Sequence, residues 1–323
     1  MKSLCLVKFS ALGDLAQIER FLPSLAKSFK ITLLTTPMGK AYFEDSPYIE
    51  KFIILTSKKL FDVIKLIPQF RVKFDYFVDL QGNDRSKFLS FFAKARCLGN
   101  YQRGFFMTNL EEAEKGYIAE NSIIHRHTLS ILRPLVCEFK FTHFHQRKQS
   151  YIVFHVGSSP IWASKRLPKE KWIEFSKIVT EKFGLPIVLT GGPDEMEYVQ
   201  EIGSLLHGEI IIKAGKTTLQ ELKSLLREGY LTIATDSGPM HISASLGTPT
   251  IGMYGASYWV TQECNQWIHA APFGPWSTKL LASNADQQDV KTTKDKKSVV
   301  NDFSMLDLKM ALDNIDLYIG SGK

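Results

Sequence analysis

The chain has 323 residues and a formal net charge of +7, and its length favours two domains of ordinary size over one. Hydrophobic residues make up 44% of it and charged residues 23%, which is typical of a folded globular protein and excludes a disordered chain. No apolar run reaches the roughly 20 residues of a membrane span, and the first eight residues hold too short an apolar part for a signal peptide.

The charge is unevenly distributed, with +9 in residues 1–150 and −2 in the remainder. A basic half attracts nucleic acid, an anionic membrane surface or an anionic substrate, and a lysine-rich solvated surface is the plainer alternative. The four cysteines (Cys5, Cys97, Cys137 and Cys264) are far apart and form no C-x-x-C motif. This usage favours reduced thiols in a cytoplasmic protein.

Strand and helix patterns alternate through the first half. Residues 4–9 are predicted as a strand and residues 10–15 as the turn into a helix, which places Asp14 where ligands of open α/β sheets bind. Capping of the helix is the alternative role for this aspartate. Further strands are expected at 31–35, 52–55 and 76–80, and residues 61–70 have helical spacing.

A polar stretch at 142–150 is the expected domain boundary. Four histidines (His125, His127, His143 and His145) lie in or before it, without cysteine or glutamate at metal-ligand spacing. Surface histidines are therefore the favoured interpretation. The sequence also lacks a D-x-D triplet, so we expect no metal site.

The second half again alternates between strands and helices. Strands are predicted at 151–155, 187–190 and 210–212, and a helix at 169–182, followed by Gly184. Thr218 and Glu221 have the spacing of a capping box. Beyond residue 255 the chain is predicted to be irregular, until apolar residues at helical spacing indicate a last helix at 303–319.

The most informative stretch is residues 235–244, which follow a short buried strand pattern at 230–234. Asp236 and Ser237 stand where helix N-caps belong, and Pro239 suits the first turn. Gly238 leaves the helix amides open to a phosphate or diphosphate. On local physics alone, a well-capped helix with His241 as an ordinary first-turn residue is an equal alternative.

The run D-S-G-P-M-H at 236–241, with L-G-T-P-T at 246–250 and the strand after it, resembles the bacterial lipopolysaccharide heptosyltransferase family, glycosyltransferase family 9. Three other segments resemble motifs of that family: S-x-x-G-D at 10–14, D-x-Q-G-x-x-R-S at 79–86, and the block from Gly157 through Lys165 to Trp172. The resemblance spans almost the whole chain and is strongest from 151 to 255.

The resemblance implies a GT-B α/β fold, in which two Rossmann-like domains face a central cleft. The acceptor domain is expected at 1–148 and the donor domain at 149–302, with a C-terminal helix at 303–323 packing back on the first domain. The implied activity is inverting, metal-independent transfer of heptose from ADP-heptose to a lipopolysaccharide inner-core hydroxyl, on a Kdo or heptose acceptor, without a cofactor. Such an enzyme acts in the cytoplasm of a Gram-negative cell, with peripheral contact to the inner leaflet and no nucleic-acid partner.

Residue roles also follow from the resemblance. It makes Asp14 the catalytic base and assigns the donor to Ser158, Ser159, Lys165, Glu195, Asp236, Ser237, Gly238 and His241, with Glu195 on the ribose. Acceptor contacts are expected from Ser10, Gly13, Arg85 and Arg103. Asp79 is either a further acceptor contact or a structural partner of Arg85. The sequence departs from the family where Leu22-Pro23 comes late, because residues 17–20 form additional helix or loop near the acceptor site.

Two other classes of protein remain open at this stage. One is a GT-B transferase with another nucleotide sugar, or a UDP-sugar epimerase, against which the G-P-M-H and S-x-x-G-D motifs argue. The other is a basic nucleotide- or nucleic-acid-binding protein without catalysis, which has no use for Asp14. Nucleic-acid bases would call for exposed aromatic residues, whereas the phenylalanines at 88, 91 and 92 are interpreted as helix core.

Overall fold

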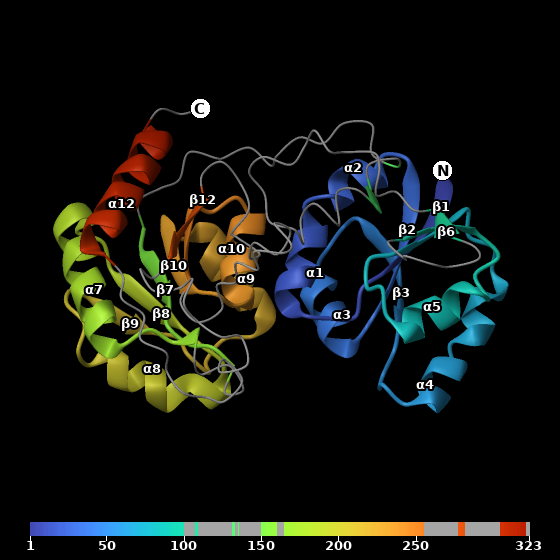
Figure 1. Ribbon diagram of the computed structural model, residues 1–323, viewed down its shortest axis with the longest axis horizontal. Coiled ribbons are helices and arrows are strands. Elements are labelled where there is room, and N and C mark those ends of the chain that lie inside the picture. The colour runs from blue at the N-terminus through green and yellow to red at the C-terminus, as the bar shows by residue number, and fades with distance from the viewer. Residues whose placement is uncertain are drawn as a thin grey trace, which may run out of the picture. The chain divides into compact units, whose positions relative to one another are not determined.

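The computed structural model describes residues 1–99, 107–108, 131–132, 135, 150–159, 165–254, 277–281 and 304–320. The chain divides into two compact units, Met1–Phe141 and Thr142–Lys323. The boundary expected at 148/149 falls among residues outside the described ranges. Within those ranges, each unit is built on one parallel sheet of six strands (Figure 1).

The sheet of the first unit has the strand order β3-β2-β1-β4-β5-β6, and every described pairing in it is parallel. The central strand β1 carries four consecutive buried residues, Leu4 to Val7, because both faces of a parallel sheet are covered. The strands are β1 (Lys2–Val7), β2 (Phe29–Thr35), β3 (Ile49–Ile54), β4 (Tyr76–Asp79), β5 (Arg96–Gly99) and β6 (Met107–Thr108).

The first unit's helices are α1 (Leu12–Glu19), α2 (Leu22–Ala26), α3 (Pro37–Phe43), α4 (Leu60–Ile64), the 3-10 helix η1 (Ile67–Arg71) and α5 (Asp84–Ser90). The single helix expected at 61–70 is wrong. Pro68 has no N–H to bond to the Ile64 carbonyl and its ring crowds that carbonyl, so α4 stops at Ile64 and η1 begins at Ile67.

The expectation that Phe88, Phe91 and Phe92 form helix core is also partly wrong. Helix α5 ends at Ser90, and Phe91 is 66% exposed. Phe88 and Phe92 are half-buried against the core of the unit, edge to face with each other at 5.2 Å. The early end of α5 therefore turns one of the three rings to solvent.

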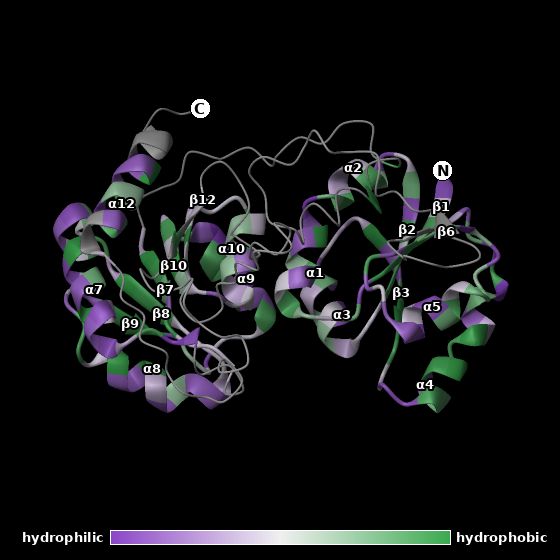
Figure 2. Ribbon diagram, in the orientation of Figure 1, coloured by the Kyte–Doolittle hydropathy of each residue, from purple (hydrophilic) through white to green (hydrophobic). Residues whose placement is uncertain are grey.

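The second unit's sheet has the order β12-β11-β10-β7-β8-β9, again parallel throughout the described pairings. Its strands are β7 (Ile152–His155), β8 (Ile187–Thr190), β9 (Ile210–Ile212), β10 (Leu231–Thr235), β11 (Thr250–Tyr254) and β12 (Ser277–Leu281). Its helices are α7 (Lys169–Phe183), the 3-10 helix η5 (Pro193–Glu195), α8 (Met196–Gly203), α9 (Leu219–Glu228), α10 (Gly238–Ser245) and α12 (Met305–Gly320). Figure 1 shows α7, α8 and α12 on one face of the sheet and α9 and α10 on the other. Figure 2 shows the strands between them to be largely hydrophobic.

Two helix ends in this unit follow the sequence patterns. Helix α7 ends at Gly184, whose φ of 62° is in the left-handed region. The capping box of α9 is formed as expected: the hydroxyl of Thr218 accepts the Glu221 N–H at 3.2 Å, and the Glu221 carboxylate accepts the Thr218 N–H at 2.7 Å.

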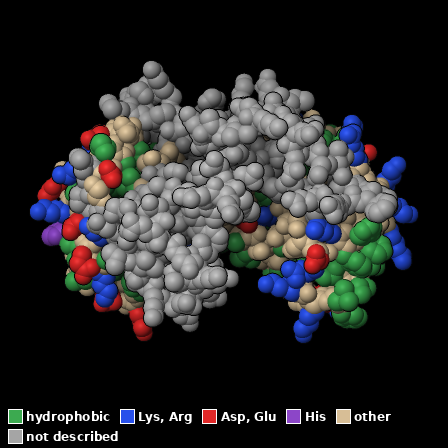
Figure 3. Space-filling view, viewed as in Figure 1, with side chains coloured by type: hydrophobic (Ala, Val, Ile, Leu, Met, Phe, Trp, Pro, Cys, Tyr) green, Lys and Arg blue, Asp and Glu red, His purple; other side chains and the backbone are tan. Residues whose placement is uncertain are grey.

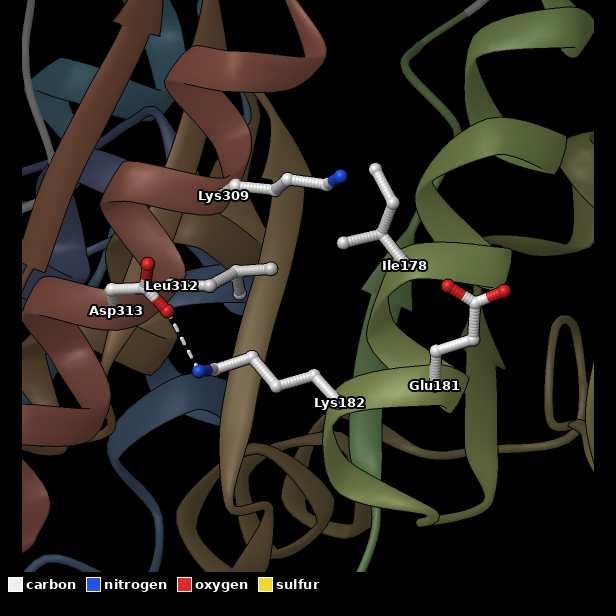
Figure 4. Close-up of a pocket in the computed structure, with 6 residues that line it drawn as sticks. All are labelled: Ile178, Glu181, Lys182, Lys309, Leu312 and Asp313. Atoms are coloured by element: carbon white, nitrogen blue, oxygen red, sulfur yellow. Dashed lines mark hydrogen bonds and ion pairs between the residues drawn. The ribbon is translucent and has the colours of Figure 1, made fainter.

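The last helix packs within the second unit, because Leu308, Leu312 and Ile315 of α12 are buried in the same core as Trp172 of α7. Its expected packing on the first unit stays a prediction. Lys182 of α7 binds Asp313 at 2.7 Å. This pair spans a surface groove of about 280 Å³ between the two helices (Figure 4).

Candidate active site

The N-terminus of α10 is a site with open backbone donors. Strand β10 is buried along its whole length and delivers Asp236 and Ser237 to the start of the helix. The Ser237 hydroxyl bonds back to the Thr235 carbonyl at 3.0 Å and makes no cap for α10. With Pro239 lacking an N–H, the amides of Gly238 and Met240 remain as donors at the positive end of the helix dipole.

A lysine reaches this helix end from elsewhere in the unit. Lys165 Nζ lies 2.7 Å from Asp236 Oδ2 and donates to the Asp236 carbonyl at 3.3 Å. The side chains of the pair are only 21% and 14% exposed. Asp236, expected as a donor contact, thus holds the ammonium group beside the amides of α10. The ammonium group thus lies at the same helix end as these amides, with its charge balanced by the Asp236 carboxylate.

The loop after β7 is fixed by an arginine that the sequence reading did not single out. Arg166 donates to the Ser158 carbonyl at 2.9 Å, and its guanidinium lies 4.4 Å from the centre of the Tyr198 ring. Ser158 is buried, whereas Ser159 is exposed. In the sequence, the signal that could have identified Arg166 as a site residue is its position directly after Lys165.

Glu195 presents a buried carboxylate beside the same loop. Its Oε2 accepts the Gly192 N–H at 2.7 Å, while Oε1 is buried and has no hydrogen-bond partner among the described residues. A Cβ at position 157 would lie 2.3 Å from Oε1, so any larger residue there would displace the Glu195 carboxylate. Gly157 therefore permits the close approach of a carboxylate that retains one free acceptor atom.

His155 is a second residue that the sequence reading missed. It lies at the end of β7, is buried, and has Nδ1 3.1 Å from the Thr190 hydroxyl. Burial lowers the pKa of its imidazole, and the Glu195 carboxylate opposes that effect. No sequence motif marks it, because a histidine that ends a buried strand resembles any other core residue.

In the first unit, Asp14 both caps α1 and keeps one oxygen free. Its Oδ2 accepts the Ala11 N–H at 3.1 Å and lies 3.3 Å from Lys8 Nζ. Lys8 also donates to the Leu80 carbonyl at 3.1 Å, which fixes the ion pair to the neighbouring strand end. Oδ1 has no hydrogen-bond partner among the described residues, and the side chain is 29% exposed. The carboxylate is thus oriented by one oxygen and can accept a proton at the other.

The turn that carries Ser10 and Gly13 is tied to the turn after β4. Gln81 Oε1 accepts the N–H groups of Phe9 at 2.9 Å and Ser10 at 3.2 Å. Ser10 itself is exposed and Gly13 is buried.

Asp79 and Arg85 have different roles in this second turn. Asp79 is fully buried, with Oδ1 accepting the N–H groups of Gln81 at 2.8 Å and Gly82 at 2.9 Å, and burial raises its pKa. We therefore assign it to the turn and not to an acceptor. Arg85 is half-buried, and its Nε has no hydrogen-bond acceptor among the described residues. Arg103 lies outside them.

The residues between Asp14 and Leu22-Pro23 are built into helix. Helix α1 continues to Glu19, and α2 begins at Leu22. Gln17 is buried, and Tyr42 donates to Glu19 Oε2 at 2.5 Å. Residues 17–19, expected as additional helix or loop, thus belong to α1.

Comparison with known proteins decides the family. The sequence model of glycosyltransferase family 9 (heptosyltransferase) matches residues 133–300. The chain belongs to glycosyltransferase family 9. It is 24% identical to lipopolysaccharide heptosyltransferase 1 of Campylobacter coli, over 79% of this chain and 84% of that protein. It is 25% identical to the lipopolysaccharide core heptosyltransferase OpsX of Haemophilus influenzae, over 88% of this chain and 92% of that protein.

Solved structures agree on the fold. A family 9 glycosyl transferase from Veillonella parvula superposes with a TM-score of 0.73 at 21% identity, covering 98% of this chain and 97% of that one. Heptosyltransferase WaaC of E. coli, solved with ADP, superposes with a TM-score of 0.68 at 15% identity, covering 97% of this chain and 99% of that one. This family 9 glycosyltransferase accordingly has the GT-B fold of two parallel-sheet α/β domains.

Neither a metal-ligand cluster nor a membrane-spanning helix is found in the described part of the chain. It holds no group of three His, Cys, Asp or Glu side chains that could bind a metal ion, and His125, His127, His143 and His145 lie outside it. No helix within those same ranges combines the length and apolar character needed to cross a bilayer.

Proposed function

We propose that this family 9 glycosyltransferase transfers heptose from ADP-heptose to a hydroxyl of the lipopolysaccharide inner core, with inversion and without a metal ion. The names of the relatives from Campylobacter coli and Haemophilus influenzae support the sugar and the pathway. WaaC, solved with ADP and with ADP-2-deoxy-2-fluoro heptose, supports the donor. The observation that carries the proposal is the Lys165–Asp236 pair, which lies directly before the uncapped N-terminus of α10.

The diphosphate of the donor is assigned to this cationic end of α10. As the bond between the anomeric carbon and ADP breaks, negative charge builds on the leaving diphosphate. Lys165, the N–H groups at Gly238 and Met240, and the hydroxyls of Ser158 and Ser159 stabilise it. Fixed donors of this kind replace the divalent ion that other transferases use. Ser237 and His241 complete the lining, with Asp236 orienting Lys165.

The ribose is assigned to Glu195. Vicinal hydroxyls are donors, and Glu195 Oε1 is a buried acceptor to which no described residue donates. A hydroxyl that reaches it satisfies an atom that is otherwise costly to bury.

Asp14 is the proposed general base. The acceptor hydroxyl attacks the anomeric carbon from the side opposite ADP and gives its proton to Oδ1, while Oδ2 stays bound to Ala11 and Lys8. One bond forms as the other breaks, and a single displacement inverts the configuration.

The acceptor is assigned to the basic first half of the chain. Carboxylates of Kdo and phosphates are anionic, and the Nε of Arg85 has no acceptor within the described ranges. Ser10, Gly13 and Arg103 are proposed as further acceptor contacts. An acceptor of this kind is held in a membrane, so the enzyme acts in the cytoplasm with peripheral contact to the inner leaflet.

The direct test is incubation of the protein with ADP-heptose and a panel of truncated lipid acceptors in the presence of EDTA. Mass spectrometry should detect one added heptose on one acceptor of the panel. Parallel reactions with UDP- and GDP-linked sugars should give none. Transfer from another nucleotide sugar, or transfer that EDTA abolishes, would refute the corresponding part of the proposal.

A further inference from the structure

An apolar surface lies on the first unit, on a segment that contains none of the candidate active-site residues. It is formed by residues 58–73, which include α4 and η1. Leu60 and Phe61 are each 67% exposed, Val72 is 61% exposed and Ile64 is 43% exposed. These side chains point outward because Val63, Leu66 and Phe70 of the same segment are buried in the core of the unit. We name the exposed side chains of residues 58–73 the α4 surface.

Basic residues surround these apolar side chains. The segment contains five lysines and arginines, all exposed, and a single acidic residue. The basic residues are Lys58, Lys59, Lys65, Arg71 and Lys73. Figure 2 shows α4 as strongly hydrophobic, and Figure 3 shows hydrophobic side chains at the lower right with blue basic groups around them.

The one acidic residue does not cancel this charge at the surface. The Ser57 hydroxyl donates to Asp62 at 2.5 Å, and Lys65 Nζ lies 3.5 Å from the same carboxylate. The hydrogen bond from Ser57 is the main cause that lowers the pKa of Asp62. Asp62 is thus bound within the segment, and residues 58–73 keep a net charge of +4.

We propose that the α4 surface docks this protein on an anionic lipid bilayer, with Leu60, Phe61 and Ile64 inserted at the boundary of headgroups and acyl chains. Amphipathic helices with lysine beside leucine and phenylalanine lie in this interface, and each lysine near an anionic leaflet adds attraction. Lys65 Nζ lies 4.3 Å from the centre of the Phe61 ring. A lysine in this position can cover the ring while its ammonium reaches a lipid phosphate.

Charge complementarity favours lipid over the other occupants of such a surface. A second copy of the chain would bring two basic rims together. The cores of protein interfaces are depleted in lysine, whereas this patch has lysines directly beside Leu60. An anionic bilayer satisfies the apolar and the cationic side chains at once.

This inference extends the proposed function and rests on it, because the proposed acceptor is anchored in a membrane. Docking itself can be measured without any acceptor. The two proposals can therefore fail separately.

The experiment is co-sedimentation of the full chain with vesicles of phosphatidylethanolamine and phosphatidylglycerol, and with vesicles of phosphatidylcholine alone. The Leu60→Ser/Phe61→Ser variant should bind the anionic vesicles at least about tenfold more weakly, because two apolar side chains no longer insert. Lys58→Gln/Lys59→Gln should weaken binding roughly 25-fold, at about fivefold for each lysine. All of these side chains are exposed, so thermal melting and ADP binding should not change.

Matched controls come from elsewhere on the chain. Leu205→Ser/Met310→Ser removes two apolar residues of the second unit that are 44% and 49% exposed. Lys27→Gln/Lys30→Gln removes two exposed lysines of the first unit. Both controls should bind vesicles like the wild type.

Failure of wild-type binding to anionic vesicles would overturn the inference, as would equal binding to phosphatidylcholine or equal losses in the controls. Transfer to a deacylated, water-soluble acceptor should be the same for Leu60→Ser/Phe61→Ser and wild type. Vesicle binding without any heptosyl transfer would refute the proposed function and leave the docking surface standing. Heptosyl transfer without vesicle binding would refute the docking surface and leave the proposed function standing.

Discussion

Replacement of Lys165 by alanine should have two effects of different origin. The ammonium group is bound to Asp236 at 2.7 Å, with side chains only 21% and 14% exposed. Exposed ion pairs contribute about 0–1 kcal/mol, while loss of one partner of a buried pair costs about 3–5 kcal/mol. The Lys165–Asp236 pair is intermediate in burial, so its loss should lower the free energy of unfolding by about 1–3 kcal/mol. The loss of a charge-assisted bond to the diphosphate should weaken ADP binding by about 1.5–3 kcal/mol, roughly 10- to 150-fold in Kd.

Calorimetry with ADP and denaturant unfolding separate these effects. Lys165→Ala and Asp236→Asn should be strongly non-additive in stability, because each removes the same ion pair. The loss of ADP affinity on Lys165→Ala should persist in the Asp236→Asn background if the lysine contacts phosphate itself. Lys169→Ala is the matched control, since Lys169 pairs with Glu201 at the surface. An unchanged Kd for ADP in a folded Lys165→Ala protein would refute the assignment.

Three further outcomes are expected. ADP should bind with the same Kd with and without EDTA in calorimetry, and binding that disappears on chelation would contradict the metal-free site. Arg85→Ala should raise the acceptor KM while the Kd for ADP stays constant, and equal damage to both would make Arg85 structural. Burial lowers the pKa of His155, so below about pH 6.5 the unfolded chain binds a proton that the folded protein does not. In thermal melts, the stability of the wild type should therefore fall as the pH drops from 6.5, and that of His155→Asn should fall less steeply. Identical pH slopes for the two proteins would mean that groups other than His155 titrate.

Local sequence patterns predicted the elements whose ends are determined by capping residues and glycines close by in the sequence. The strand before Asp236 and the helix that follows it are both formed, and Gly247 follows that helix with a left-handed φ of 76°. So are the Thr218 capping box and the end of α7 at Gly184. Each depends on residues within a few positions, where backbone preference and capping decide the outcome.

Packing between distant segments decided the rest. The apolar stripe of α12 indicated a helix, but only the core beside Trp172 shows which unit it completes. Strand β12 begins with polar residues, and of its described side chains Leu280 is buried, so alternation gave no signal. Likewise, the pairing of Lys165 with Asp236 joins residues 71 positions apart. Single-sequence motifs could name both residues but not their contact.

Asp14 is the residue on which the catalytic account depends. Asp14→Asn retains an oxygen to accept the Ala11 N–H, so the cap of α1 should survive. The amide cannot take up a proton at neutral pH, and general-base catalysis contributes roughly 10²- to 10⁴-fold. Asp84→Asn is the matched control, because Asp84 is an exposed aspartate in the first turn of α5 in the same unit.

The most direct measurement is the turnover of ADP-heptose by folded Asp14→Asn protein on the acceptor that the wild type uses, with EDTA present and ADP affinity measured on the same sample. The account predicts turnover reduced by about 10²- to 10⁴-fold, an ADP Kd equal to that of the wild type, and normal turnover for Asp84→Asn. Near-normal turnover by a folded, ADP-binding Asp14→Asn protein would contradict it.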